Sequence, residues 1–229
     1  APWVGVSGIG FLSALLAALL ATAWHLRAQP PRVLAALAVA GIVMVLSVAV
    51  GTREFSKPSG ELSVSLLQGN VPQDEKFSMQ HVPQTLAWMA HALGKARGDL
   101  VVAPETAVPL LPDQLAELVP DYWPALRARF ETSGQAALIG VPLGDYSSGY
   151  TNSVIGLSAA SRDGQPYRYD KVHLVPFGEF IPTGFRWFTE LMDIPLGDFA
   201  RGPLNAPSFS VGGERIAPNI CYEDLFGAE

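Results

Sequence analysis

Apolar and polar positions divide the chain into two unlike parts. Residues 1–24 and 33–52 are two uncharged runs rich in Ala, Leu and Val, each close to the roughly 20 residues that a helix needs to cross a bilayer core. The short segment between them holds two prolines and two arginines, Arg27 and Arg32, and proline cannot continue a helix. The pattern predicts a hairpin of two transmembrane helices, at about residues 3–24 and 33–52.

The two arginines of this turn set the orientation that we expect. Arginines in short loops stay in the cytoplasm, so the turn is predicted there and everything after Arg53 on the other side of the membrane. Two other interpretations remain, a cleaved signal peptide and a buried hairpin of a soluble protein. A signal peptide has a basic start and a shorter apolar region, and two such runs in tandem are unusual for a soluble core.

The remaining residues form a linker and a polar domain. Residues 53–61 are rich in polar residues, Pro and Gly and predict a short linker, and we expect a domain over residues 62–229. Short apolar or alternating runs in this domain are typical of strands, and other runs have helical spacing. We expect strands at residues 62–68, 99–103, 136–141, 150–157, 208–211 and 215–220, and helices at residues 79–97 and up to residue 131. This order predicts an α/β domain with a largely buried sheet.

Charge and cysteine content exclude several classes of function and of stabilising bond. All 21 acidic residues follow residue 52, so the polar domain carries net negative charge, and we expect no nucleic-acid partner because phosphate binding needs clustered cations. A single cysteine excludes a disulfide within the chain. The spacing of His, Cys and acidic residues does not suggest a metal site, and no cofactor is predicted.

The one cysteine, Cys221, follows the apolar run 215–220. A lone cysteine is usually an inert buried thiol, but two other chemically useful groups also occur near predicted strands. Glu105 follows the run 99–103, and Lys171 lies in a segment dense in polar and aromatic residues. A thiolate can attack an acyl group, a carboxylate can take the thiol proton, and a cation can stabilise the resulting oxyanion. Equally, Glu105 could be a helix-capping or surface acid and Lys171 a solvated lysine.

Three motifs carry a family resemblance. They are Pro-Glu-Thr around Glu105, the stretch Tyr-Asp-Lys-Val-His-Leu-Val-Pro-Phe-Gly-Glu around Lys171, and Ile-Cys-Tyr-Glu around Cys221. They resemble the Glu, Lys and Cys motifs of the nitrilase superfamily of carbon–nitrogen hydrolases, whose domain is an α-β-β-α sandwich. The resemblance implies that Glu105 is the general base, that Lys171 stabilises the tetrahedral intermediate and that Cys221 is the nucleophile.

The same resemblance implies supporting residues. Glu179 and Glu223 match acids that support the site in the family, and Tyr222 lies beside the nucleophile. Residues 181–203 are rich in large apolar side chains, and we expect this segment to shield or gate an acyl site. Phe185, Trp187 and Phe188 are the lid candidates.

One membrane-bound branch of the superfamily is especially similar. The stretch Leu-Gln-Gly-Asn-Val-Pro-Gln at residues 67–73, the phrase at residues 173–182 and the preceding apolar hairpin are similar to the apolipoprotein N-acyltransferases. This likeness implies an enzyme that moves a fatty acyl chain from a phospholipid, through a cysteine thioester, to the N-terminal α-amine of the diacylglyceryl-cysteine of an apolipoprotein. It also implies a multi-pass protein of the bacterial inner membrane with its catalytic domain in the periplasm.

The chain also departs from that branch. It supplies two membrane helices where the family has more, and it ends eight residues after Cys221, so we expect a fragment whose catalytic domain is truncated at its C-terminus. Two other functions stay open: an amidase that uses the same Glu, Lys and Cys but passes its acyl group to water, and a non-catalytic, membrane-anchored binding module.

Overall fold

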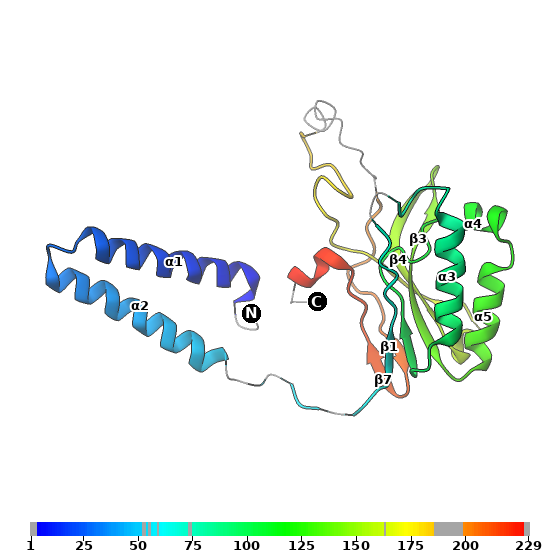
Figure 1. Cartoon of the computed structure of the whole chain (residues 1–229), viewed down its shortest axis with the longest axis horizontal. Helices are drawn as coiled ribbons and strands as arrows, with labels where there is room; N and C mark the ends of the chain where they lie inside the picture. Colours follow the sequence, from blue (N-terminus) through cyan, green and yellow to red (C-terminus); the bar gives the residue numbers. More distant parts are fainter. Residues whose placement is uncertain are drawn as a thin grey trace. The chain divides into compact units, whose positions relative to one another are not determined.

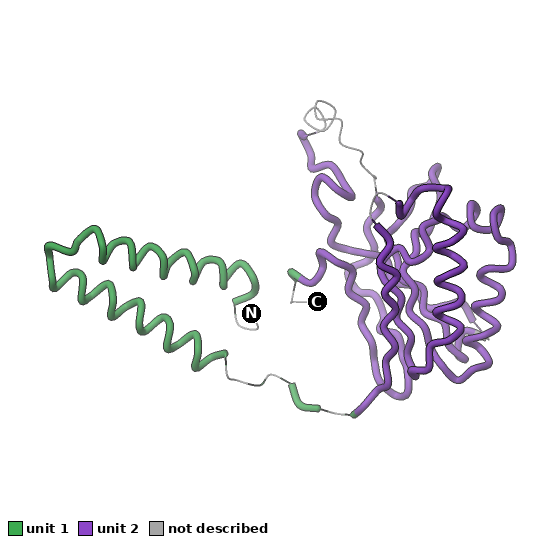
Figure 2. The backbone as a smooth tube through the Cα atoms, viewed as in Figure 1, with its two compact units in different colours: residues 1–60, 225–229 green, residues 61–224 purple. Residues whose placement is uncertain are grey.

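The computed structural model describes residues 4–51, 54, 56–58, 60–72, 75–162, 164–185 and 199–226 of the chain. These residues belong to two compact units (Figure 2): residues 1–60 with 225–229, and residues 61–224. Of the lid candidates, Phe185 is described and is 47% exposed. Trp187 and Phe188 lie outside the described residues.

The first unit is a helical hairpin. Helix α1 (Gly5–His25) and helix α2 (Pro30–Gly51) contact each other along their lengths, and most of their apolar side chains are exposed. By length and composition both could cross a membrane. Ser13 and Thr22 each donate a hydrogen bond to the carbonyl four residues earlier, so their hydroxyls are satisfied within the helix. Helix α2 begins three residues earlier than predicted, because proline is tolerated in the first helical turn.

The second unit is built on a mixed sheet of five strands in the order β1-β2-β3-β4-β5. The strands are β1 (Val64–Leu66), β2 (Leu100–Val102), β3 (Ala136–Asp145), β4 (Gly149–Leu157) and β5 (Tyr167–Asp170). Strands β1, β2 and β3 are parallel, and β4 and β5 add to them in antiparallel pairs. The parallel strands therefore end at one edge of the sheet, where side chains from separate loops can gather.

Three helices cover one face of this sheet (Figure 1). They are α3 (Val82–Lys95), α4 (Pro112–Leu118) and α5 (Tyr122–Thr132). Their apolar faces and the sheet share one core, in which Phe130 and Ile139 are fully buried. The Tyr122 hydroxyl donates to the carbonyl of Leu86 at 3.3 Å, and burial raises the pKa of Tyr122 to about 12.

A β-hairpin covers the other face. Strands β6 (Phe209–Val211) and β7 (Glu214–Ile216) are joined by Gly212 and Gly213, which both have positive φ, as tight hairpin turns require. Phe209 packs over Gly156 of β4, where any larger side chain would meet its ring. The predicted α/β class is thus confirmed, and the described residues of this unit form three layers, one of helices and two of strands.

At three places the structure adds to or corrects the predicted elements, each for a physical reason. The last strand ends at Ile216 instead of residue 220, because Pro218 has no N–H for a strand ladder. The Pro-rich helical stretch expected up to residue 131 consists of two helices with Pro120 between them. Strand β5 was not predicted, because its sequence Tyr-Arg-Tyr-Asp gives a weak alternation signal beside a polar segment.

Candidate active site

Glu105 lies in a tight turn directly after β2. The backbone of Ala103 still pairs with β3, donating to the carbonyl of Leu138 at 2.9 Å, and the chain then turns through residues 104–106. This turn passes so close to Gly140 of β3 that a side chain there would collide with its backbone. Thr106 has a φ of 51°, a conformation that non-glycine residues seldom adopt. The position of Glu105 therefore depends on a glycine in the neighbouring strand.

Lys171 follows β5 and is almost fully buried, with 1% of its surface exposed. Its backbone N–H donates to the carbonyl of Asn152 on β4 at 2.8 Å, which extends the strand pairing by one residue. Its ammonium lies 2.8 Å from Glu179 Oε2 and 3.7 Å from Glu105 Oε1. Because a buried charge is costly unless it is paired, this cation is held by two carboxylates from different loops.

Asn152 joins the same two carboxylates, and the sequence analysis did not identify it. Its side-chain amide donates to Glu105 Oε1 at 2.6 Å and to Glu179 Oε1 at 2.9 Å, and the residue is 5% exposed. An asparagine in the middle of a predicted strand was the available signal, because a buried amide needs hydrogen-bond partners.

The two acids have different surroundings. Both oxygens of Glu179 are engaged, by Lys171 and Asn152 and by the backbone N–H of Val175 at 2.9 Å, and its side chain is 12% exposed. Glu105 is 35% exposed, and among the described residues its contacts are made through Oε1. Glu179 is thus suited to fix Lys171, whereas Glu105 keeps an oxygen that can accept a proton.

A second polar cluster braces the same strands on the helix-covered face. Asp170 Oδ1 accepts hydrogen bonds from Thr151 at 3.0 Å, Ser153 at 2.6 Å and Arg168 at 2.8 Å. Because neighbouring residues of a strand point to opposite faces, Asp170 fixes the strand while Lys171 reaches the other side.

Cys221 is exposed and opens a short 3₁₀ helix, η2 (Cys221–Leu225). Its φ of 53° is left-handed, so the backbone turns sharply at the cysteine. The predicted strand does not reach this point, since β7 ends at Ile216. Hydrogen bonds to Glu223 hold the turn instead. Tyr222 next to it is half-buried.

Glu223 holds the cysteine turn against the lysine segment. This residue is 4% exposed, and its Oε2 accepts from the N–H of Ile220 at 2.9 Å. Its Oε1 accepts from the N–H of Val172 at 2.7 Å and from the hydroxyl of Tyr169 at 2.8 Å. One carboxylate therefore bonds to the residue before Cys221 and to the residue after Lys171.

The structure thus gathers most of the candidate residues. Glu105, Lys171 and Glu179 form one ion-paired cluster, and the turn that carries Cys221 is fastened to the segment that carries Lys171. Within the part of the chain that is described, His, Cys, Asp and Glu side chains do not form a group of three that could hold a metal ion. A thiol, a partly exposed carboxylate and a buried ammonium are the components of covalent acyl transfer.

Comparison with known proteins finds relatives whose sequences are similar to this chain over its whole length. The chain is 51% identical to an apolipoprotein N-acyltransferase of Verminephrobacter eiseniae, matching 100% of this chain and 44% of that protein. It is 44% identical to the protein of that name from Ralstonia nicotianae, over 100% of this chain and 42% of that protein. It is 33% identical to the protein of that name from Neisseria meningitidis, over 100% of this chain and 45% of that protein. The chain thus spans less than half the length of the curated relatives it matches. No protein-family model matches it.

Solved structures similar to this chain are more distant. They include an amidase from Nesterenkonia sp., with 18% identity and a TM-score of 0.40 over 71% of this chain and 56% of that one. A carbon–nitrogen hydrolase from Helicobacter pylori G27 has 17% identity and a TM-score of 0.35, over 67% of this chain and 49% of that one.

The layers and the Glu–Lys cluster beside a thiol-bearing turn define an α/β domain with the groups of a covalent acyl-transfer site. By sequence, the chain is homologous along its whole length to the apolipoprotein N-acyltransferases. These names and the two apolar helices indicate a membrane-associated protein.

Replacing Glu223 with Gln should release the cysteine turn. A glutamine offers one acceptor oxygen where the carboxylate has two, so at least one buried N–H loses its partner, at a cost of about 1–3 kcal/mol. We expect a lower melting temperature in detergent micelles and faster alkylation of Cys221 by iodoacetamide. Asp224→Asn is the matched control, because Asp224 is exposed, and it should change neither. Unchanged stability and alkylation in Glu223→Gln would contradict the fastening role.

Gly140→Ala should displace Glu105. The added methyl group would overlap the backbone of residues 104–106, and overpacking of this kind costs about 1–3 kcal/mol. Gly94→Ala in α3 is the control, because open space surrounds that position and alanine favours a helix. Thermal unfolding should show a loss for Gly140→Ala and no loss for Gly94→Ala. Equal melting temperatures for Gly140→Ala and the parent protein would rule out the tight approach.

Proposed function

We propose that this protein is an apolipoprotein N-acyltransferase, which moves a fatty acyl chain from a phospholipid to the N-terminal α-amine of a diacylglyceryl-cysteine. The observation that carries the proposal is the buried ammonium of Lys171, paired with Glu105 and Glu179 beside the turn of Cys221. The homologues of this name support the substrate class. In this proposal residues 1–52 are the membrane hairpin, residues 53–61 the linker, and the catalytic domain begins at residue 62.

In the first step, the proton of the Cys221 thiol passes to Glu105, and the sulfur attacks the ester carbonyl of the phospholipid. A carbon–sulfur bond forms, and the negative charge that develops on the carbonyl oxygen is stabilised by the Lys171 ammonium. The ester carbon–oxygen bond then breaks, and Glu105 returns the proton to the leaving oxygen of the lysophospholipid. A preorganised oxyanion partner of this kind contributes roughly 10²–10³-fold in rate.

In the second step, the neutral α-amine of the acceptor attacks the thioester. A carbon–nitrogen bond forms and the carbon–sulfur bond breaks, so an amide is released. Glu105 takes a proton from the amine and returns it to the Cys221 sulfur, which restores the starting state. The thioester has to be shielded from water between the two steps.

The membrane hairpin suits this chemistry. A phospholipid is presented in the plane of the bilayer, so an enzyme that acts on it gains from being held there. Arginines in the turn between α1 and α2 favour a cytoplasmic position for that turn, and we propose that the catalytic domain faces the periplasm across a bacterial inner membrane. Shielding of the thioester by the segment of Phe185, Trp187 and Phe188 belongs to the same proposal.

Incubation of the micelle-solubilised protein with phospholipid should add one long-chain acyl group to Cys221, as read by intact-mass spectrometry. A diacylglyceryl lipopeptide with a free α-amine should remove the group, while buffer alone should leave it in place over the same time. Cys221→Ala should take up no acyl group. Removal at the same rate in buffer would indicate an amidase, and no adduct would favour a binding module.

Conservative changes in the two acids should separate their roles. Glu105→Gln keeps an amide oxygen for Asn152 but cannot accept the thiol proton, so acylation of Cys221 should slow by roughly 10²–10⁴-fold. Its melting temperature should fall less than that of Glu179→Gln, because Glu105 lies 3.7 Å from the Lys171 ammonium and Glu179 lies 2.8 Å from it. Glu179→Gln weakens the pairing of a buried cation, so it should lower the melting temperature as well as the rate. Acylation rates from intact mass and thermal unfolding in micelles measure both. A Glu105→Gln protein that acylates at the parental rate would remove Glu105 as the base.

A further inference from the structure

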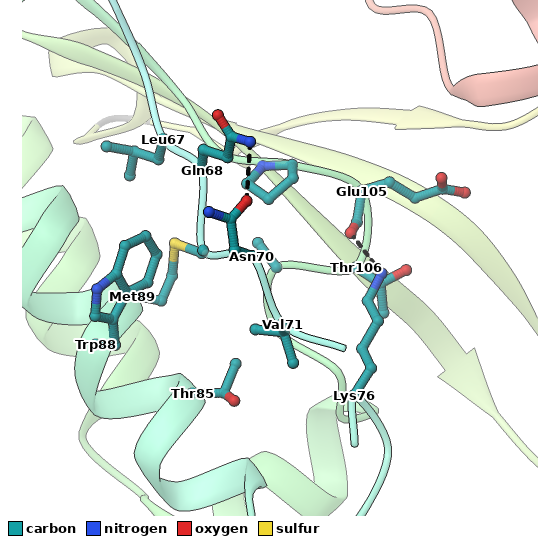
Figure 3. A pocket seen from close by; sticks show the side chains of 13 residues that line it. Leu67, Gln68, Asn70, Val71, Lys76, Thr85, Trp88, Met89, Glu105 and Thr106 are labelled. Atoms are coloured by element: carbon teal, nitrogen blue, oxygen red, sulfur yellow. Dashed lines mark hydrogen bonds between the residues drawn. The ribbon is translucent and has the colours of Figure 1, made fainter. Parts of the chain in front are cut away.

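A cavity of about 220 Å³ lies beside the Glu105 turn (Figure 3). Trp88 and Met89 of helix α3 form one wall, and Lys76 and Thr106 lie across from them. Each water in the liquid occupies about 30 Å³, so the cavity is large enough for a phosphate-sized group with some solvent. The Glu105 backbone lines it, and the cavity therefore shares one residue with the candidate active site.

Lys76 brings a positive charge to this cavity. Its ammonium donates to the backbone carbonyl of Glu105 at 3.0 Å, and in Figure 3 the Glu105 carboxylate extends away from it. Burial lowers the pKa of Lys76, and the nearby charge of Glu105 partly opposes that shift. An ammonium has three N–H donors, and among the described residues this carbonyl is the acceptor found for them. A bound anion would supply further acceptors and add to the counter-charge that Glu105 provides only in part.

The segment after β1 adds an amide to the same cavity. Asn70 has a φ of 48°, so its backbone turns sharply, and its side-chain oxygen accepts from Gln68 at 2.8 Å. This contact leaves the Asn70 amide nitrogen on the side of Met89 (Figure 3). A cation and an amide donor at one apolar-walled cavity favour a singly charged oxyanion.

We infer that this cavity is a subsite for the phosphate of the acyl donor. The inference rests on the proposed function, in which the donor is a glycerophospholipid. Glu105 connects the two ammonium groups, since its carbonyl accepts from Lys76 and its carboxylate pairs with Lys171. In a glycerophospholipid the reacting ester and the phosphate are likewise separated by one short glycerol unit. With the ester carbonyl at Lys171, the phosphate would fall near Lys76, whereas the diacylglyceryl acceptor has no phosphate to place there.

The test compares two donors with identical acyl chains, phosphatidylglycerol and diacylglycerol, each in the same micelles. Acylation of Cys221, followed by intact mass, gives the preference of the protein for the donor with phosphate. We expect Lys76→Met to lower this preference at least tenfold and Lys76→Arg, which keeps the charge, to retain most of it. Lys95→Met, at an exposed position near the end of α3, is the matched control and should keep both rate and preference.

An equal loss for both donors in Lys76→Met would mean that Lys76 only supports the Glu105 turn, and would overturn the subsite. A donor preference of Lys76→Met equal to that of the parent protein would also overturn the subsite. If inorganic phosphate binds, as seen by ³¹P line broadening that Lys76→Met removes, while the parent protein uses both donors equally, the site takes free phosphate and the headgroup assignment is wrong. A parent protein that is acylated by neither donor would contradict the proposed function itself, which is a different result from all of these.

Discussion

The buried ammonium of Lys171 is the constraint on which the rest of the site depends. With 1% of its surface exposed, it needs negative partners, and these come from Glu105 after β2 and Glu179 after β5. Asn152 on β4 donates a hydrogen bond to each of these two carboxylates. Removing any one of these contacts would leave a charge or a polar group unpaired in the interior, so the loops that carry them are tied to one another.

Backbone strain gathers around this cluster. Four described non-glycine residues have positive φ, and each lies in a segment of the site or its cavity: Asn70, Thr106, Phe177 and Cys221. Such conformations cost roughly 1–3 kcal/mol each and persist only where the surroundings enforce them. Two contacts enforce them here: Glu223 ties the backbone of Ile220 to that of Val172, and Gly140 leaves space for the turn of Glu105.

Glu105 contacts both lysines, Lys171 through its side chain and Lys76 through its backbone. Its carboxylate faces the buried cation, and its carbonyl faces the half-buried Lys76 beside a cavity. One residue thus separates the place where an acyl group would react from a place suited to an anion. The proposed division of a phospholipid between the two follows from this geometry, and the apolar hairpin of α1 and α2 fits a substrate that stays in a bilayer.

The sequence by itself determined the two apolar helices, the α/β class and the three chemical groups at Glu105, Lys171 and Cys221, because hydrophobic period and local motifs are properties of neighbouring residues. It did not reveal strand β5, the bridging role of Asn152 or the cavity at Lys76. These depend on contacts between residues far apart in the chain, such as the 47 positions that separate Glu105 from Asn152. Only the tertiary structure decided that Glu179 pairs closely with the buried cation and that Glu105 stays partly exposed, since burial is a property of the packed sheet and its loops.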